Sequence, residues 1–178
     1  MKILAISGSL RTASINSALL RAVQSLAPAG VKVDIYTDLG KLPLFNPDLE
    51  TALPDAVAQL HAQVDAADAL LIASPEYAHG VTGAIKNGLD WLVSHEPFAG
   101  KAVAVLNISP RASHADAALR ETLRTMAAHI IEPASLTIPL LGSGLGETGM
   151  LATPAVADAL RAMLLALAGS RCNRDGAI

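Results

Sequence analysis

The sequence predicts a doubly wound α/β fold, in which helices cover both faces of a parallel sheet. Short runs rich in Val, Ile and Leu alternate along the chain with longer segments whose apolar residues recur every three or four positions. The short runs are continuously apolar, which is typical of strands buried on both faces. Strict alternation of strands with amphipathic helices implies right-handed crossovers, and therefore a sheet that is covered on both sides.

The first half of the chain contains three predicted strands and two predicted helices. Residues 2–7 ("KILAIS") form the first strand, and residues 15–27 ("INSALLRAVQSLA") form a helix because Leu, Ala and Val recur at helical spacing. Residues 31–36 ("VKVDIY") form the second strand. A helix at residues 53–67 ("LPDAVAQLHAQVDAA") precedes the third strand, residues 69–74 ("ALLIAS").

The second half continues the alternation. A helix at residues 81–95 ("VTGAIKNGLDWLVSH") leads to the fourth strand, residues 101–109 ("KAVAVLNIS"). The helix at residues 115–129 ("ADAALRETLRTMAAH") precedes the fifth strand, residues 130–139 ("IIEPASLTIP"). The amphipathic segment at residues 153–169 ("TPAVADALRAMLLALAG") closes the series as a helix.

Length and composition predict one domain over residues 1–178. A chain of 178 residues with 52% hydrophobic side chains is long enough for one substantial core and short for two. The polar end "SRCNRDGAI", from about residue 170, is expected to be a flexible tail. Its Cys172 is the single cysteine of the chain, so this chain alone builds no disulfide framework and no cysteine-based metal site.

Charge and hydropathy exclude several classes of partner. A net charge of -3 and a pI near 5.9 give no general basic field for nucleic acid or an anionic membrane. The N-terminus lacks the pattern of a basic segment followed by an apolar one, and charge, Pro or Gly interrupts every apolar stretch before ~20 residues. We therefore expect a cytoplasmic protein that is not exported and acts on small molecules.

A phosphate-binding turn is predicted after the first strand. Gly8 permits a sharp exit from the strand, and a helix begins at about Ser14, so its positively polarised N-terminal end faces the turn. Arg11 can place two parallel hydrogen bonds on phosphate oxygens. The alternative is that Ser14 only caps the helix and Arg11 is a solvated charge. The side chains able to donate to a phosphate are Ser9, Arg11, Thr12, Ser14, Asn16 and Ser17.

Two common phosphate-binding motifs are absent from this turn. The dinucleotide fingerprint requires glycines at its first, third and sixth positions, but Leu10 and Ala13 stand there after Gly8. No Lys-Ser or Lys-Thr pair follows Gly8, so a P-loop is excluded as well. The turn suits the terminal phosphate of a mononucleotide, which some doubly wound sheets hold at their switch point.

A second informative stretch, "SPEYAHGVTGAIKNGLDWL", follows the third strand. Pro75 ends the strand, and Gly80 and Gly83 are expected to let the backbone turn closely around a flat ligand. Glu76, Tyr77 and His79 are alternative catalytic acids or bases. The structural alternative is a loop in which Tyr77 packs on the core.

"GSLRTASIN" and "SPEYAHGVTGAIKNGLDW" together resemble the NADPH-dependent FMN reductase family, which includes bacterial quinone and chromate reductases and related azoreductases. The resemblance covers residues 1 to about 138. It implies a flavodoxin-like fold, a five-stranded parallel sheet in the order 2-1-3-4-5, and tightly held FMN. It also implies two-electron transfer from NADPH or NADH to quinones, free flavin or similar acceptors such as chromate and azo compounds.

The resemblance assigns cofactor-binding residues by position. Ser9, Arg11, Ser14 and Asn16 correspond to the residues that hold the FMN phosphate, and we add the neighbouring hydroxyl of Ser17. Because the cofactor carries the chemistry, no catalytic side chain and no metal are expected, and His61 and His129 are expected to be isolated helix residues. The residues that would border the flavin ring are Pro75, Glu76, Tyr77, Ala78 and Ser109.

The chain departs from the family pattern at three places that concern acceptor preference. Ala78 stands where many relatives have Asn, and Thr82 stands where they have Pro. After the fourth strand this chain has "SPRASHAD" where a glycine-rich turn is common. Within it, Arg111 and His114 either flank the phosphates of the nicotinamide nucleotide or are solvated charges.

Two other functional classes share this fold. A flavodoxin-like electron carrier without reductase activity usually has an arginine-free phosphate loop and a strongly acidic face, unlike this chain. A receiver-like regulatory domain requires acidic residues after the first strand, where this chain has Ser7, Gly8 and Ser9.

The helix after the second motif predicts self-association. Trp91, Leu92 and Val93 follow one another, and one sheet face cannot bury all three, although Trp91 alone can be core. We therefore expect a homodimer or homotetramer. Lys86 and Asp90, four residues apart on the same helix, are expected to pair at the surface.

Overall fold

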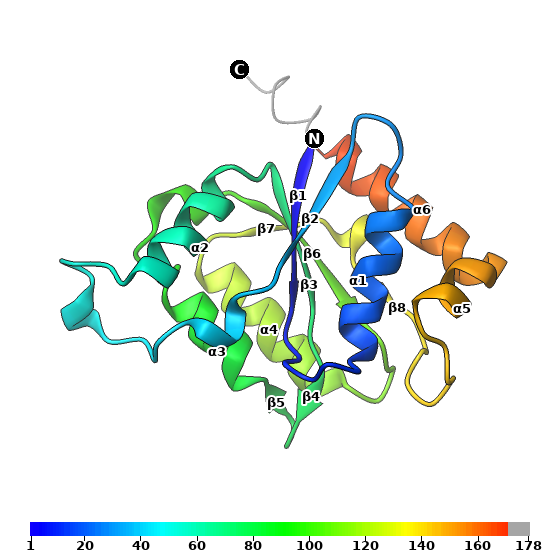
Figure 1. The fold of residues 1–178 in the computed structure, drawn as a ribbon, viewed down its shortest axis with the longest axis horizontal. Helices are drawn as coiled ribbons and strands as arrows, with labels where there is room; N and C mark the ends of the chain where they lie inside the picture. Colours follow the sequence, from blue (N-terminus) through cyan, green and yellow to red (C-terminus); the bar gives the residue numbers. More distant parts are fainter. Residues whose placement is uncertain (171–178) are drawn as a thin grey trace.

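The computed structural model describes residues 1–170, and the tail predicted beyond them lies outside the described residues. A parallel sheet runs through the molecule in the order β2-β1-β3-β6-β7, and β8 also pairs with β6 (Figure 1). The predicted sheet and strand order are therefore confirmed. The strands of this sheet are β1 (Lys2–Ser7), β2 (Lys32–Tyr36), β3 (Ala69–Ala73), β6 (Ala102–Asn107), β7 (His129–Ile130) and β8 (Leu136–Thr137).

Helices cover both faces of the sheet. Figure 1 shows α1, α5 and α6 on one side and α2, α3 and α4 on the other. Each long helix lies at a predicted position, with bounds shifted by a few residues. The helices are α1 (Ile15–Ser25), α2 (Asp55–Asp65), α3 (Gly83–Asp90), α4 (Ser113–Thr125), α5 (Glu147–Ala152) and α6 (Pro154–Gly169).

The core divides at the sheet because successive residues of a strand point to opposite faces. Ile3 and Ala5 of β1 belong to the cluster that includes the buried residues of α1 and α6. Leu4 and Ile6 of the same strand belong to the cluster with α2, α3 and α4. A strand of this kind is apolar at every position, which explains why the predicted strands showed no alternation.

The fifth strand is not continuous, which corrects the prediction for residues 130–139. β7 and β8 each contain two residues, and a 3₁₀ helix at Glu132–Ala134 separates them. Pro133 lies inside that turn and has no N–H to donate to a ladder, so the strand is interrupted there. His129 accordingly begins β7 and is not the helix residue that was expected.

A hairpin and a short α-helix were not predicted, nor were short 3₁₀ helices at Leu39–Lys41, Pro47–Leu49 and Glu96–Phe98. An antiparallel hairpin, β4 (Glu76–Tyr77) and β5 (Gly80–Val81), follows β3. α5 precedes α6 and packs against α1, where Arg21 Nε lies 2.8 Å from Glu147 Oε2. All of these elements are too short to show a sequence period.

The three residues that follow α3 bear out the expectation that one sheet face cannot bury them all. Trp91 and Leu92 are core residues, exposed by 1% and 2%, whereas Val93 is 64% exposed. One sheet face therefore does bury Trp91. Lys86 and Asp90 form the predicted pair one helical turn apart. Among residues 1–170, no helix combines the length and apolar character needed to cross a membrane.

Candidate functional site

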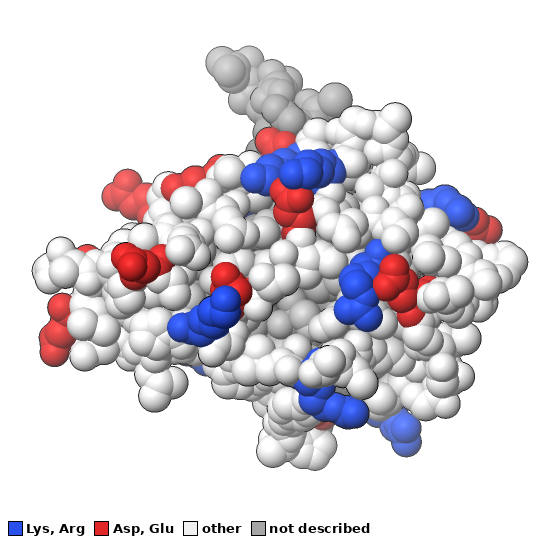
Figure 2. Space-filling model, viewed as in Figure 1, with Lys and Arg blue, Asp and Glu red and all other residues white. Residues whose placement is uncertain are grey.

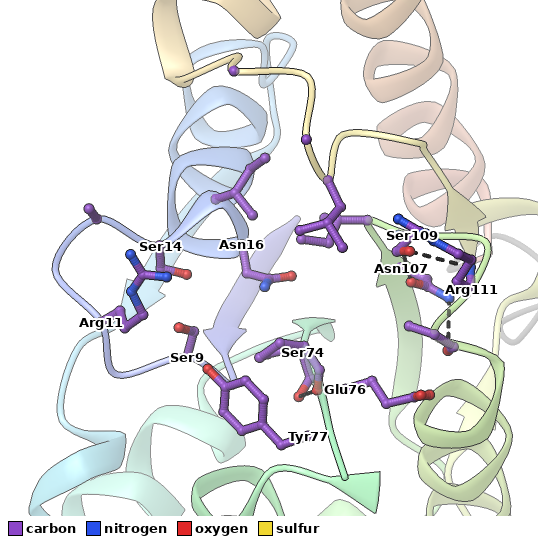
Figure 3. A pocket seen from close by; sticks show the side chains of 18 residues that line it. Ser9, Arg11, Ser14, Asn16, Ser74, Glu76, Tyr77, Asn107, Ser109 and Arg111 are labelled. Carbon is purple, nitrogen blue, oxygen red and sulfur yellow. Dashed lines mark hydrogen bonds between the residues drawn. The ribbon is translucent and has the colours of Figure 1, made fainter. Parts of the chain in front are cut away.

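A pocket of about 560 Å³ lies at the carboxyl ends of β1, β3 and β6, where a doubly wound sheet binds ligands (Figure 3). The loop after β1 supplies one wall, the segment after β3 a second, and the turn after β6 a third. Eight of the ten predicted cofactor residues line it: Ser9, Arg11, Ser14, Asn16, Pro75, Glu76, Tyr77 and Ser109.

The loop after β1 presents polar side chains that are buried beside the pocket. Ser9, Ser14 and Asn16 are exposed by 8%, 6% and 2%. Asn16 Oδ1 is buried and has no hydrogen-bond partner among the described residues, so this amide is available to a ligand. Ser14 Oγ accepts from the backbone N–H of Ser17 at 3.3 Å and so caps α1, as the structural alternative proposed, but its own proton remains available for donation.

Arg11 is an exposed side chain on the same wall. Its guanidinium makes no hydrogen bond or ion pair within the part of the chain that the structure describes. Figure 3 shows Arg11 near Ser14 at one end of the pocket. An unpaired arginine beside buried hydroxyls and a helix N-terminus forms a donor set suited to phosphate.

Gly8 holds this loop close to the next motif. A Cβ at Gly8 would lie 2.2 Å from Ser74 Oγ and 2.7 Å from Ile85 Cγ1, so no larger residue fits. Thr82 Oγ1 donates to Gly8 O at 2.9 Å and accepts from the backbone N–H of Ile85, which caps α3. Thr82 therefore ties α3 to the loop after β1.

The second wall is formed by the hairpin after β3. Tyr77 is 54% exposed and faces the pocket in Figure 3, so it does not pack on the core as the alternative held. The reversal is made by Ala78 and His79, whose φ angles are 49° and 58°, and not by the glycines that were expected to turn the chain. Ala78 does not line the pocket.

Glu76 is held by two partners, which corrects its candidacy as a free acid or base. Its Oε2 accepts from the backbone N–H of Ala115 at 2.8 Å, and its Oε1 lies 3.2 Å from His79 Nδ1. The N–H of Ala115 is the main cause that lowers the pKa of Glu76; burial opposes it, and the charges of His79 and His114 assist it. The carboxylate therefore stays ionised and anchors the hairpin to α4.

The third wall is a preformed turn after β6. Asn107 Oδ1 accepts from the N–H of Ser109 at 2.9 Å, and Asn107 Nδ2 donates to Ala112 O at 3.2 Å. Ser109 Oγ accepts from the N–H of Arg111 at 3.3 Å. Figure 3 shows Arg111 on the wall opposite Arg11. Asn107 was missed from sequence, where it reads only as the end of a strand.

A further part of the wall was also missed. Leu141, Gly142 and Gly144 line the pocket from the loop between β8 and α5. Gly142 and Gly144 have φ angles of 83° and 71°, which glycine adopts without strain. The signal available in the sequence was the run "LGSGLG", which marks an irregular loop but not its place in space.

Ser17 lies on the other side of the loop after β1. Its Oγ is 2.8 Å from Ser7 Oγ, and it lines a separate hollow of about 510 Å³ together with Arg11 and Tyr36. Burial, and next the charge of Asp38, raise the pKa of Tyr36 to about 12. Ser17 therefore stands apart from the pocket that holds the other predicted side chains.

The histidines contact one another in pairs. His79 and His114 lie edge to face with ring centroids 4.4 Å apart. His61 is not isolated, since its ring stacks on His95 at 3.9 Å. Among residues 1–170, no group of three or more His, Cys, Asp or Glu side chains could hold a metal ion.

Known proteins are similar to this chain over the segments that form the pocket. The model of the NADPH-dependent FMN reductase family matches residues 1–140. The chain is 34% identical over 173 residues to an NAD(P)H-dependent FMN reductase of Pseudomonas aeruginosa. This match covers 94% of this chain and 93% of that protein. It is also 34% identical over 109 residues to a quinone reductase of Escherichia coli. That match covers 59% of this chain and 58% of that protein.

A solved structure extends the similarity to nearly the whole chain. FerB, a flavoenzyme NAD(P)H:(acceptor) oxidoreductase from Paracoccus denitrificans, superposes with a TM-score of 0.81 at 26% identity. The match covers 94% of this chain and 95% of that structure.

Proposed function

The chain belongs to the NADPH-dependent FMN reductase family, and from this premise we propose that its pocket holds FMN and passes electrons from NADPH or NADH to quinones. It is an FMN-dependent NAD(P)H oxidoreductase. The observation that carries the assignment of the site is the convergence of the two motifs on one pocket at the carboxyl end of the sheet.

The donor set of the pocket fits FMN. At one end, Arg11 is unpaired within residues 1–170, and the buried amide of Asn16 can donate from Nδ2, while its unpaired Oδ1 can accept from a hydroxyl of the ligand. Ser9 and Ser14 add hydroxyl protons at the same end. Between the walls, Tyr77, Ile108 and Leu141 offer apolar surface to a flat ring. The phosphate of FMN would bind the polar side chains at one end of the pocket, and its ring would stack against the apolar side chains.

Each wall then has a separate task. Ser9, Arg11, Ser14 and Asn16 hold the phosphate, while Ser17 can only support the loop from behind through Ser7. Backbone groups of residues 75–77 and the turn at Ser109 border the ring, and Ala78 forms part of the hairpin turn behind this wall. When bound, FMN supplies two-electron chemistry between a nicotinamide nucleotide and an acceptor, so the protein's contribution is orientation and hydrogen bonding.

Quinones are the acceptors we favour, because an acceptor must stack over the flavin in the same open pocket. Free flavin, chromate and azo compounds are further candidates that meet the same requirement. If the nicotinamide nucleotide and the electron acceptor bind the same face of the flavin one after the other, the kinetics will be ping-pong.

The test is purification followed by an acceptor panel. We expect a yellow protein that releases FMN on denaturation and oxidises NADPH or NADH when a quinone is present. Protein that holds FMN but leaves both nucleotides unoxidised would support the electron carrier. Protein that binds no FMN on reconstitution would reject the assignment of the pocket.

We also propose that the protein is a homodimer or homotetramer. Leu44 and Val93 are large apolar side chains that are 85% and 64% exposed. Covering such side chains favours association. Light scattering at micromolar concentration should show a dimer or tetramer, and Val93→Asp should shift it toward monomer. A monomeric wild-type protein contradicts this proposal.

A further inference from the structure

The pocket carries two arginines, and the proposed cofactor accounts for one of them. Arg11 and Arg111 stand on opposite walls (Figure 3). Neither guanidinium has a hydrogen-bond or ion-pair partner among the residues that the structure describes. FMN carries one phosphate, which the wall with Arg11 receives. Arg111 is then a cation without an assigned partner.

The backbone at Arg111 is fixed by its turn. The amide of Asn107 bridges the N–H of Ser109 and the carbonyl of Ala112, and Ser109 Oγ accepts from the N–H of Arg111. These contacts hold the backbone of the turn in place. The guanidinium of Arg111 has no partner within the turn, and the turn places this residue on the pocket wall.

No carboxylate of the pocket neutralises Arg111. Glu76 is the single acidic residue among those that line the pocket. Both of its oxygens are engaged, one by the N–H of Ala115 at 2.8 Å and the other by His79 at 3.2 Å. Arg111 is exposed in the free protein, so a ligand that covers its guanidinium removes water from this cation, and a negative charge on the ligand would compensate for that loss.

We propose that Arg111 makes the enzyme selective for electron acceptors that carry an anionic group, such as quinones with a sulfonate, a carboxylate or an ionised hydroxyl. This inference rests on the proposed function. Arg111 acts on binding and not on electron transfer. A charged acceptor pairs with its guanidinium, whereas a neutral quinone of the same ring leaves it unpaired.

The experiment compares naphthoquinone sulfonate with unsubstituted naphthoquinone. The measured quantity is the ratio of kcat/KM for the charged to the neutral acceptor. We expect this ratio to fall about tenfold in Arg111→Ala, to fall further in Arg111→Glu, and to recover in part in Arg111→Lys. Arg124→Ala is the matched control. It removes a cation of α4 whose Nη2 lies 3.5 Å from Glu132 Oε1, outside the pocket, and should leave the ratio unchanged.

A binding measurement without turnover completes the test. The dissociation constant of naphthoquinone sulfonate for the oxidised, FMN-loaded protein, followed by flavin fluorescence, should rise about tenfold in Arg111→Ala. A ratio that stays within twofold in Arg111→Ala, or that falls equally in Arg124→Ala, overturns the proposal. An increased KM for NADPH with an unchanged ratio assigns Arg111 to the donor's phosphates and overturns it as well. Failure of the proposed function differs, because wild-type protein would then turn over neither quinone.

Discussion

Arg11 combines exposure with a lack of protein partners, which distinguishes it from the arginines that form surface salt bridges. Arg21 and Arg161, for example, are exposed but each lie 2.8 Å from a carboxylate oxygen. Arg111 resembles Arg11, because its guanidinium has no partner among residues 1–170. Beside Arg11, the buried amide of Asn16 leaves Oδ1 unpaired. This oxygen accepts hydrogen bonds, so it would pair with a hydroxyl of the ligand and not with the phosphate. The polar groups of this wall that lack protein partners are therefore the ones expected to bind.

Replacing Arg11 with Ala should weaken FMN binding about ten- to a hundredfold without unfolding the protein. A charge-assisted contact to phosphate contributes roughly 1.5–3 kcal/mol, which corresponds to that range. Arg11→Lys should recover part of the affinity, because a point charge keeps the attraction but loses the paired hydrogen bonds. Titration monitored by flavin fluorescence measures the dissociation constants.

Riboflavin and a distant arginine provide the controls for Arg11. Riboflavin lacks the phosphate, so wild type and Arg11→Ala should bind it with similar weakness. Arg161→Ala removes the same charge on α6, outside the pocket, and should leave the FMN dissociation constant unchanged. An FMN dissociation constant that is the same in Arg11→Ala as in wild type would remove Arg11 from the phosphate site.

Sequence alone predicted most of the pocket's polar side chains, because their motifs are continuous along the chain. "GSLRTASIN" brings Ser9, Arg11, Ser14 and Asn16 to the pocket in one short segment. Ser17 was expected there too, but the helix turns its hydroxyl toward Ser7. Leu141 could not be found, since its place on the wall depends on how the split fifth strand directs the loop after it.

At the scale of elements, three non-glycine residues among residues 1–170 adopt positive φ, and each of them ends or reverses an element. Ala78 and His79 make the two-residue turn of the hairpin, a turn in which Asn and Gly are preferred. Ala127 follows α4 with φ 57°. The N–H of Ala128 bonds to Leu123 O and that of Ala127 to Arg124 O, both at 2.9 Å, which is a Schellman motif with Ala at the position that usually holds Gly.

Ala127→Gly should therefore stabilise the protein. A left-handed conformation costs an L-residue about 1–2 kcal/mol, and the added freedom of glycine in the unfolded chain offsets about 0.5–1 kcal/mol. The net gain is about 0.5–1 kcal/mol, or roughly 1–4 °C in Tm for a chain of this size. Ala117→Gly, in the exposed middle of the same helix, should instead destabilise by about 1 kcal/mol. Thermal unfolding tests both, and a decrease in Tm for Ala127→Gly would contradict the prediction.

The hairpin and α4 are joined through Glu76, which makes their contact depend on pH. The pKa of Glu76 is lowered in the folded state, chiefly by the N–H of Ala115. Because the folded pKa lies below the unfolded one, the carboxylate stabilises the fold above the unfolded pKa, and this contribution is lost as pH falls through the folded pKa.

Glu76→Gln should lower Tm at neutral pH relative to wild type. The difference should narrow as pH falls below about 4.3, the ordinary pKa of Glu, and disappear below the lowered pKa. Glu121→Gln is the control, since that carboxylate on α4 has no hydrogen-bond or ion-pair partner within residues 1–170. Thermal melting curves of wild type and both variants, recorded from neutral to acidic pH, measure this difference in Tm. A difference that is constant with pH would mean that packing, and not the ionised carboxylate, accounts for the effect of the substitution.

The elements that sequence predicted correctly are those long enough to show a period. Four strands and five long helices lie where their patterns placed them. The fifth strand was drawn as continuous because apolar residues flank Pro133 on both sides, yet the proline and its 3₁₀ turn break the ladder. The hairpin was missed because its turn residues, Ala78 and His79, carry no turn signal in the sequence, although both adopt positive φ.

At the scale of the whole molecule, the pocket joins segments that are far apart in sequence. Its walls come from the loop after β1, the hairpin after β3, the turn after β6 and the loop at residues 141–146, which lies beyond the family match at residues 1–140. Arg21 of α1 also pairs with Glu147 of α5, next to that last loop. A ligand in the pocket therefore contacts both the N-terminal and the C-terminal parts of the chain.

FMN should consequently stabilise residues 1–170 as one cooperative unit, which tests the prediction of a single domain. At a free concentration one hundred times its dissociation constant, a ligand raises the free energy of unfolding by about 2.7 kcal/mol and Tm by roughly 5–11 °C for a chain of this size.

Trp91, the single tryptophan, is buried outside the pocket with its Nε1 donating to Pro43 O at 2.8 Å. Tryptophan emission and far-ultraviolet circular dichroism should therefore report one transition, shifted equally by FMN. Riboflavin at the same concentration should give a smaller shift. If FMN moved the dichroism transition and left the tryptophan transition at its original temperature, the α3 side would be a separate unit and the single-domain prediction would be wrong.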